Sequence, residues 1–318
     1  MSTPTPLETD WSEAPDLLEG AMQLALTPEG CDVDYWIANA AQGTWRGLVN
    51  GHAPGDVIPP LMFEEGPLRA AVLGEFAFRA IAEEIATRAI SFLVAYAPDI
   101  PTMEFYSTQI LDEARHARAF RAHLVELGIP EGQLAERMEE LAGSQRDRVL
   151  RPLEEFALPV MRDRRDFVGG VIILTVLVEG VLAPTGALSE RKWRVFDPAA
   201  AGIARGANID EIRHLTVGGT IVRRHLAAHP EETARINSLI ADGRRLWAEL
   251  PAIDVVYERE LLFQQGIEQH GRLLGDYELV PGRRLADTTP EERLTLAQTW
   301  SHEVQTARLS YMGLDADL

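Results

Sequence analysis

The sequence predicts an all-α fold, and three observations support this prediction. Long proline-free segments rich in alanine and leucine recur along the chain and end at proline or glycine. The alternation of apolar and polar residues that marks half-buried strands is scarce, and no glycine-rich phosphate loop is present. The 318 residues, of which 46% are hydrophobic, can form one large domain. We expect a core over residues 66–230 and additional helices over residues 231–318.

Eight helices are predicted after an N-terminal part, residues 1–65, that we expect to wrap around them. Pro98 stops the first helix, and Gly128, which forms a left-handed cap easily, stops the second. Asp197-Pro198 begins a later helix, because aspartate caps a helix and proline favours its first position. The predicted helices span residues 68–97, 102–127, 131–155, 166–193, 197–229, 231–248, 254–274 and 289–312.

Charge and cysteine content exclude several classes of function. The formal net charge of −19 repels phosphate backbones and anionic lipid, so we expect no nucleic-acid partner and no membrane partner. Cys31 is the only cysteine, which excludes a disulfide within the chain and a zinc–thiolate cluster. Residues 1–20 are acidic and lack the apolar centre of a signal peptide, and we therefore expect a cytoplasmic protein.

One predicted helix is apolar enough to resemble a membrane span. Residues 167–184 are almost entirely apolar, but Glu179 interrupts them. A helix that is apolar on all sides and carries a single acid is typical of the centre of a helix bundle. We therefore expect this helix to lie in the core, with a buried glutamate.

Two five-residue strings with the pattern Asp-Glu-x-Arg-His carry the candidate chemistry. They span residues 112–116 and 210–214, inside two predicted helices. A glutamate and a histidine three residues apart lie on one helical face, so each string can offer a carboxylate and an imidazole to the same metal ion. Four-helix bundles bind two iron or manganese ions with two such pairs and one glutamate from each of two other helices. The predicted ligands from the strings are Glu113, His116, Glu211 and His214.

Hairpin geometry predicts the other two glutamates. Residues at the same height in two antiparallel helices are equally far from the turn in sequence. Glu83 and Glu113 are 30 residues apart with their midpoint at Pro98, and Glu179 and Glu211 are 32 apart with their midpoint just before the next helix begins. Glu84 is the alternative to Glu83, which we prefer because its helical face is the more apolar.

Charge balance favours a metal pair over a network of protein groups alone. Four buried carboxylates without compensation would be costly, whereas two divalent cations neutralise them. Carboxylate and imidazole ligands without thiolate are typical of iron or manganese. These ligands leave iron and manganese open, and the resemblance described next implies two iron ions, with manganese as the less favoured metal.

The paired strings, and the Glu179-Gly180 step in an apolar helix, resemble the ferritin-like carboxylate-bridged diiron oxygenases. Over about residues 70–230 the pattern is most similar to bacterial multicomponent monooxygenase hydroxylases, and more distantly to ribonucleotide reductase small subunits. The resemblance implies a ferritin-like four-helix bundle with a nonhaem diiron centre that activates O2. It also implies that the metal-ligating and catalytic residues are Glu83, Glu113, His116, Glu179, Glu211 and His214, that Asp112 and Asp210 accept hydrogen bonds from the ligand imidazoles, and that Arg115 and Arg213 pair with these aspartates.

Three positions differ from these relatives. Phe120 stands where the reductase subunits have a radical-forming tyrosine, and Ala183 stands where the hydroxylases have a threonine that Thr175 could replace. Ala207 stands where related arylamine N-oxygenases have an additional histidine. We interpret the chain as a diiron monooxygenase of specialised metabolism that hydroxylates carbon or oxidises nitrogen, for example an amine or a hydrazine. The alternatives are iron binding or storage, radical generation, or a metal-free helical interaction module.

The expected partners follow from this interpretation. They are O2, a small-molecule substrate and an external electron donor such as a reductase or a ferredoxin, because the sequence has no flavin or iron–sulfur motif. We also expect a homodimer. Candidate walls of the substrate cavity lie one turn from the predicted ligands and are Thr87, Gln109, Phe120, Thr175 and Ala183.

Overall fold

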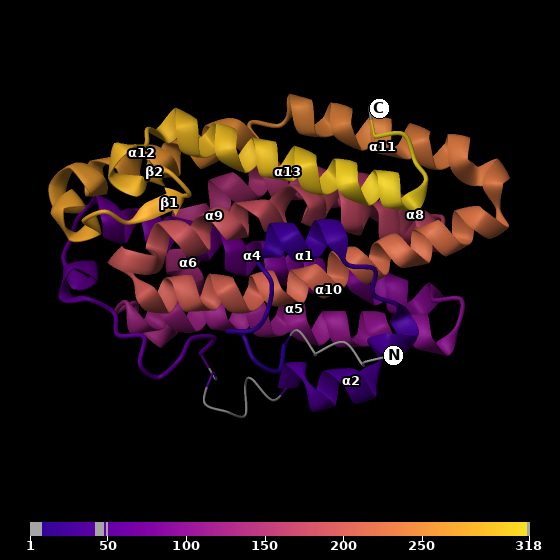
Figure 1. The fold of residues 1–318 in the computed structure, drawn as a ribbon, viewed down its shortest axis with the longest axis horizontal. Coiled ribbons are helices and arrows are strands. Elements are labelled where there is room, and N and C mark those ends of the chain that lie inside the picture. The colour runs from indigo at the N-terminus through magenta and orange to yellow at the C-terminus, as the bar shows by residue number, and fades with distance from the viewer. Residues whose placement is uncertain (1–7, 42–47, 49, 317–318) are drawn as a thin grey trace.

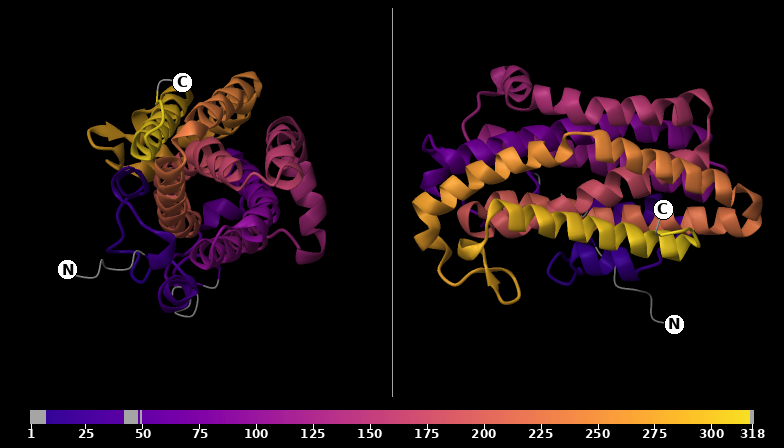
Figure 2. Two further views of the ribbon diagram at one scale, coloured as in Figure 1. Left: turned by 90° about the vertical axis from the view of Figure 1, so that its right-hand side faces the viewer. Right: turned by 90° about the horizontal axis from the view of Figure 1, so that it is seen from above.

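The computed structural model describes residues 8–41, 48 and 50–316, and this part of the chain is all-α apart from one small sheet (Figure 1). Long helical segments pack side by side along its length (Figure 2). α4 pairs with α5, α9 pairs with α10, and α5 also contacts α10, so that they surround a common core. These segments are α4 (Pro67–Tyr96), α5 (Ile100–Glu126), α8 (Phe167–Ile172) continued by α9 (Gly180–Phe196), and α10 (Pro198–Ala228).

The ends of these helices lie where the sequence places caps and breakers. The Asp99 side chain accepts a hydrogen bond from the Thr102 amide at 2.9 Å and begins α5. The Asp197 side chain accepts one from the Ala200 amide at 3.0 Å and begins α10. Gly128, with a φ of 95°, follows the end of α5. The predicted boundaries of these helices are therefore confirmed to within a few residues.

The predicted apolar helix is not regular, because π-helical turns over Ile173–Glu179 separate α8 from α9. Wide π turns leave carbonyl groups that need partners from outside the helix. Gln305 donates to the Val176 carbonyl at 3.0 Å, and the Trp247 indole donates to the Leu177 carbonyl at 2.6 Å. Tertiary hydrogen bonds therefore accompany the π turns, and Glu179 lies at their last residue.

The predicted helix over residues 131–155 is likewise divided, and it extends further than expected. α6 (Leu134–Gln145) is followed by π turns over Arg146–Leu150, then by α7 (Arg151–Leu158) and π turns over Pro159–Asp163. The apolar periodicity of the sequence does not distinguish α from π turns, so it could not predict these interruptions.

The C-terminal helices cover the core on the side opposite α2 in Figure 1. α11 packs on α8 and the π turns before α9, α12 packs on α4, and α13 packs on α9 and α10. A short hairpin between α12 and α13 was not predicted. These elements are α11 (Thr233–Glu249), α12 (Ala252–His270), β1 (Glu278–Val280), β2 (Arg283–Arg284) and α13 (Pro290–Met312), with 3₁₀ turns at Pro28–Gly30, Pro60–Phe63, Glu131–Gln133, Pro230–Glu232, Gly271–Leu274 and Leu285–Asp287.

The described part of the N-terminal segment lies against the bundle, as expected. α1 (Leu17–Gln23) contacts α9, α10 and α13, and α2 (Val33–Ala38) contacts α5. The rest of the predicted wrapping segment, residues 1–7, 42–47 and 49, lies outside the described residues.

One continuous helical stretch, Phe167–Phe196, is long and apolar enough to cross a membrane by length and composition. Its most apolar window is 78% buried inside the protein. A core helix of a bundle meets the same criteria, and this stretch packs against α4, α10, α11 and α13.

A buried ionic contact joins the end of α5 to the start of α10. His123 Nε2 lies 2.9 Å from Asp197 Oδ2, and His123 Nδ1 lies 3.3 Å from Glu126 Oε2. Burial disfavours the charged imidazole, but the hydrogen bonds to Asp197 and Glu126 outweigh it and raise the pKa of His123 to about 8. The contact holds α5 and α10 together at one end of the bundle.

We expect His123→Leu to destabilise the protein most at neutral and lower pH. The folded pKa of about 8 lies above the ordinary value of 6.5, so protonation stabilises the folded state by about 2 kcal/mol. This contribution is complete below the ordinary pKa and is lost as the pH rises through the folded pKa. Urea unfolding of the wild type and of His123→Leu from about pH 6 to about pH 9 measures this contribution. The difference between their free energies of unfolding should become smaller as the pH rises. A difference that stays constant over this range would contradict the assignment.

Candidate metal centre

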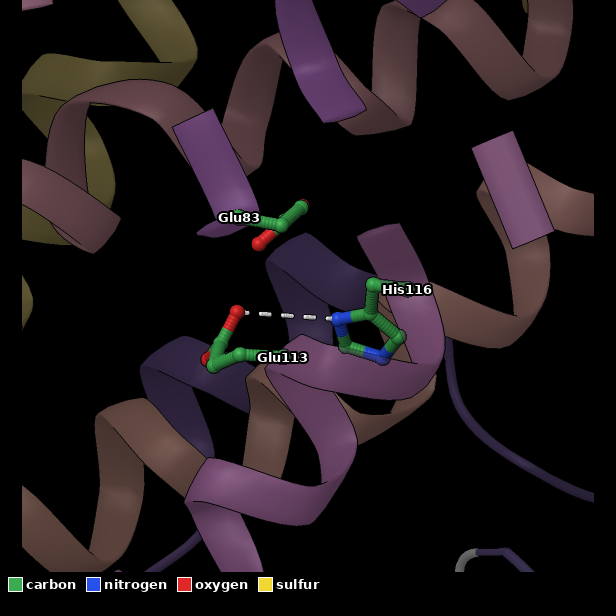
Figure 3. Close-up of side chains that lie close together, drawn as sticks. All are labelled: Glu83, Glu113 and His116. Carbon is green, nitrogen blue, oxygen red and sulfur yellow. Dashed lines mark ion pairs between the residues drawn. The ribbon is translucent and has the colours of Figure 1, made fainter. Parts of the chain in front are cut away.

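Side chains from all of the long core segments converge on Glu113, inside the bundle. Glu83, Glu113 and His116 form one group in which a ligand atom from each residue lies within 4.8 Å of the others (Figure 3). Glu113, Glu179 and His214 form a second group by the same criterion. Because Glu113 belongs to both groups, its carboxylate could contribute a ligand to each of two neighbouring metal ions.

The two oxygens of Glu113 face two different imidazoles. Glu113 Oε2 lies 3.7 Å from His116 Nδ1, and Glu113 Oε1 lies 3.3 Å from His214 Nδ1. The same His214 Nδ1 lies 3.8 Å from Glu211 Oε2 and 4.0 Å from Glu179 Oε1. The structure therefore brings the six predicted ligands into two adjoining sets that share one carboxylate.

Five buried atoms of this centre lack hydrogen-bond partners within the described part of the chain. Buried polar atoms in proteins are nearly always hydrogen-bonded, so several unpartnered atoms at one point need an explanation. Two metal ions would provide it, because every one of these atoms is a carboxylate oxygen or an imidazole nitrogen. The atoms are Glu113 Oε1, His116 Nδ1, Glu179 Oε2, Glu211 Oε2 and His214 Nδ1.

The acidic side chains of the centre repel one another in the absence of cations. Burial, and then the charge of Glu113, raises the pKa of Glu83 well above its ordinary value. Burial, and then the charge of Glu211, does the same to the pKa of Glu179. Divalent cations would relieve this repulsion, which is consistent with the charge balance expected from the sequence.

Each imidazole is oriented by the aspartate of the opposite string. His116 Nε2 lies 2.9 Å from Asp210 Oδ2, and His214 Nε2 lies 3.3 Å from Asp112 Oδ2. An Nε2–H group that donates to a carboxylate leaves the Nδ1 lone pair free for a metal ion. The expected aspartate–imidazole contacts are present, and they cross between α5 and α10.

The two arginines of the strings bind these aspartates, as expected. Arg115 Nη2 donates to Asp112 Oδ1 at 2.9 Å and to Asp210 Oδ2 at 2.6 Å. The fully buried Arg213 donates to Asp112 through Nη2 and to Glu8 Oε1 through Nε at 2.6 Å. Both aspartates thus lie between the arginines and the imidazoles.

Two contacts to this network come from the N-terminal segment and were not predicted. Glu8 pairs with Arg213, and the Trp36 indole donates to Asp112 Oδ1 at 2.8 Å. Neither residue lies in a motif or at a helical spacing that relates it to the strings, so no sequence signal pointed to them.

Glu83 and Glu84 point in different directions. Glu83 faces Glu113 and borders the cavity beside the cluster. Glu84 forms an ion pair with Arg121 of α5 on the outer side of the helix pair. This placement matches the preference for Glu83, whose role as a ligand stays a prediction.

The cavity beside the cluster is lined by Phe120 and Ala183, two of the predicted cavity residues, together with Glu83, Glu113, Glu179 and Glu211. Its other walls are mainly apolar side chains of α4, α9, α10 and α12, which include Phe78, Ala82, Val178, Leu182, Ala204 and Val255. A mainly apolar cavity of about 110 Å³ therefore adjoins the candidate metal ligands.

Thr87, Gln109 and Thr175 are not among the residues that line this cavity, and their role in a substrate site stays a prediction. The Thr87 hydroxyl donates to the Glu83 carbonyl at 2.7 Å, and Gln109 Nε2 donates to Glu179 Oε1 at 2.5 Å. Thr175 packs against Gly218 of α10, where an added Cβ would lie only 2.2 Å from the threonine oxygen. Gln109 instead acts as a support for a predicted ligand.

Comparison with known proteins adds no family assignment. The chain matches no protein-family model and no curated protein. The residues of the centre and their geometry therefore carry the functional argument. Carboxylates and imidazoles in two sets with a shared glutamate can hold a pair of redox-active metal ions beside an apolar cavity.

We expect the purified protein to bind about two iron ions per chain, and the adjacent glutamates to differ in their effect. Glu83→Ala should lower the iron content by about one ion or more, because it removes a carboxylate that faces Glu113. Glu84→Ala is the matched control and should leave the iron content unchanged. Metal analysis of the three proteins measures this. The reverse order of the two variants would show that the other face of α4 supplies the ligand.

Proposed function

We propose that this protein is a nonhaem diiron oxygenase with a ferritin-like four-helix core, which uses O2 to oxidise a small organic substrate. The observation that carries the proposal is the position of Glu113, whose two oxygens face His116 and His214 at the edge of an apolar cavity. A bridging carboxylate between two imidazole-containing sets is the arrangement that a dinuclear iron centre requires.

Each of the predicted ligands has a place in this proposal. Glu83 and His116 would hold one iron ion, and the other would be held by Glu179, Glu211 and His214, with Glu113 shared between them. When bound, the iron pair supplies the electrons that reduce O2. In a hydroxylation, a C–H or N–H bond of the substrate, O2, two electrons and two protons give the hydroxylated product and one molecule of water.

The chain's own residues hold and protect the reacting groups. Asp210 and Asp112 fix the Nε2–H tautomers of the imidazoles, and the Gln109 amide restrains Glu179. The apolar walls beside Phe120 and Ala183 exclude bulk water from the oxidising centre, which limits side reactions. Because the chain has one cysteine and no flavin motif, we propose that a separate reductase or ferredoxin supplies the electrons.

The proposal predicts that iron binding and O2 consumption are lost together in Glu179→Ala. This glutamate is the only acid within residues 167–184, so no neighbour in this segment can replace it as a ligand. O2 uptake by the reduced protein, measured over a panel of amines, hydrazines and hydrocarbons, should fall to background in the variant and remain in Glu84→Ala. Full iron content and full O2 uptake in Glu179→Ala would refute the diiron assignment, and iron loading far above two ions per chain would favour storage.

Radical generation is the second candidate, and one observation favours it. Tyr106 is fully buried, and its hydroxyl lacks a hydrogen-bond partner among the described residues. Burial, and then the charge of Glu179, raises the pKa of this phenol well above its ordinary value, which places it near the centre. The position one turn after His116 is nevertheless Phe120, which has no phenolic hydrogen to lose.

We therefore expect no persistent organic radical when the diferrous protein reacts with O2. The oxidising equivalents should pass to a bound substrate, or decay when none is present. Electron paramagnetic resonance on the wild type and on Tyr106→Phe measures this. A long-lived tyrosyl signal in the wild type that disappears in Tyr106→Phe would replace the oxygenase proposal with radical generation.

A further inference from the structure

The cavity beside the metal centre has a cationic region as well as an acidic one. Arg79 and Arg259 line it together with the four glutamates of the centre. Arg79 precedes Glu83 by one helical turn on α4, so the two residues differ in height by roughly 6 Å. Arg259 reaches the cavity from α12 and stacks over the Phe78 ring, with its guanidinium carbon 4.9 Å from the ring centre. The space between the charged regions is mostly apolar.

Arg259 has an unused hydrogen-bond donor. Its Nη1 atom is buried and has no hydrogen-bond partner within the described part of the chain. Burial lowers the pKa of Arg259, and the neighbouring charge of Arg79 lowers it further, against the opposing effect of Glu75. Buried guanidinium donors are normally paired, so this atom calls for an acceptor that the described protein groups do not provide.

The carboxylates nearest to these arginines are already shared with other cations. Glu75 Oε1 accepts from Arg79 Nε at 3.3 Å, and Glu75 Oε2 lies 3.6 Å from Lys192 Nζ. Lys192, the only lysine, also donates to Glu260. Glu260 in turn accepts from the buried Arg293 at 2.5 Å.

This buried cluster holds four cations and two carboxylates. The cations are Arg79, Lys192, Arg259 and Arg293, and the carboxylates are Glu75 and Glu260. Glu258, the other acid that influences Arg259, lies exposed on the surface. Glu190, near the cavity residue Asn208, is already paired with Arg194. Apart from the four glutamates of the centre, the cluster has two more cations than carboxylates, and the two arginines that line the cavity are half-buried. An anion bound at these arginines would balance this positive charge.

We propose that the substrate of this site is a small organic acid whose carboxylate binds Arg259 and Arg79 while its apolar part extends toward Glu83 and Glu113. The oxidation of this acid rests on the proposed diiron function, whereas the binding of its carboxylate to the two arginines does not. A carboxylate fits because a guanidinium offers it two parallel donors, and because charge-assisted hydrogen bonds are strong where water is excluded. The one-turn spacing separates Arg79 and Glu83 by roughly 6 Å along α4, which suits a short organic acid.

Binding of hexanoate to the iron-loaded protein, measured by calorimetry, tests the proposal. Hexan-1-ol serves as the neutral probe of the same length. We expect hexanoate to bind more tightly than hexan-1-ol, and Arg259→Gln to weaken hexanoate binding roughly tenfold or more while leaving the binding of hexan-1-ol unchanged. Arg259→Lys keeps the charge and should retain part of the affinity. Arg245→Gln is the matched control, because Arg245 is exposed on α11 and lies outside the cavity.

Iron content and thermal unfolding of each variant show whether the fold is kept. If Arg259→Gln unfolds, the comparison of hexanoate with hexan-1-ol on the wild type and on Arg259→Lys decides the question. Equal binding of the two probes to the wild type would overturn the proposal. Tighter binding of hexylphosphonate than of hexanoate, with the same dependence on Arg259, would overturn the choice of carboxylate.

The experiments distinguish a failure of the acid-substrate proposal from a failure of the diiron oxygenase proposal. Hexanoate binding that depends on Arg259 in a protein that binds no iron would support an acid-binding cavity and refute the diiron oxygenase. Iron binding and O2 uptake without any preference for hexanoate would support the oxygenase and refute the acid substrate.

Discussion

The arrangement of the core depends on the burial of one carboxylate, Glu113, between two imidazoles of different helices. A carboxylate inside an apolar bundle is unfavourable unless opposite charge and hydrogen bonds compensate it. Here the compensation fixes the relative height of α5 and α10, because Asp112 and Asp210 each hold the imidazole of the opposite helix. Arg115 contacts both aspartates and closes the network. A shift of either helix by one turn would break all of these contacts together.

The position of Glu179 depends on a second constraint, the π-helical turns that end at this residue. Their carbonyl groups are hydrogen-bonded by side chains of α11 and α13, so the C-terminal helices contribute to the geometry of the centre although none of the predicted ligands lies in them. Trp247 connects both features, because its indole nitrogen donates to Leu177 and its side chain also lines the cavity. The C-terminal helices thus shape the protein side of the substrate space as well as cover the core.

The sequence predicted the height of each candidate ligand along the bundle better than the direction in which side chains point around each helix. The repeated strings and the equal distances from each turn placed Glu83, Glu113, Glu179 and Glu211 at one level, because the rise per residue hardly varies between helices. Directions around a helix depend on the number of residues per turn, which the π segment changes. Thr175, one α-helical turn before Glu179, is therefore rotated away from the cavity and packs on Gly218. Contacts such as Glu8 with Arg213 come from a segment without periodicity and are decided only by tertiary packing.

The acidic and cationic regions of the cavity couple the binding of metal ions to the binding of an organic acid if both proposals hold. An organic anion that enters the cavity approaches four glutamates to within about one helical turn, and this repulsion acts in a space with little water to screen it. Two divalent cations would cancel the charge of the glutamates and leave Arg79 and Arg259 as the dominant charges that the anion meets. The acid would then bind more tightly to the metal-loaded protein than to the metal-free one. By thermodynamic linkage, the acid would in turn strengthen the retention of the metal by the same factor. On α4 an arginine lies one turn from a glutamate. This separation of charge would couple substrate binding to the presence of the metal ions that react with O2.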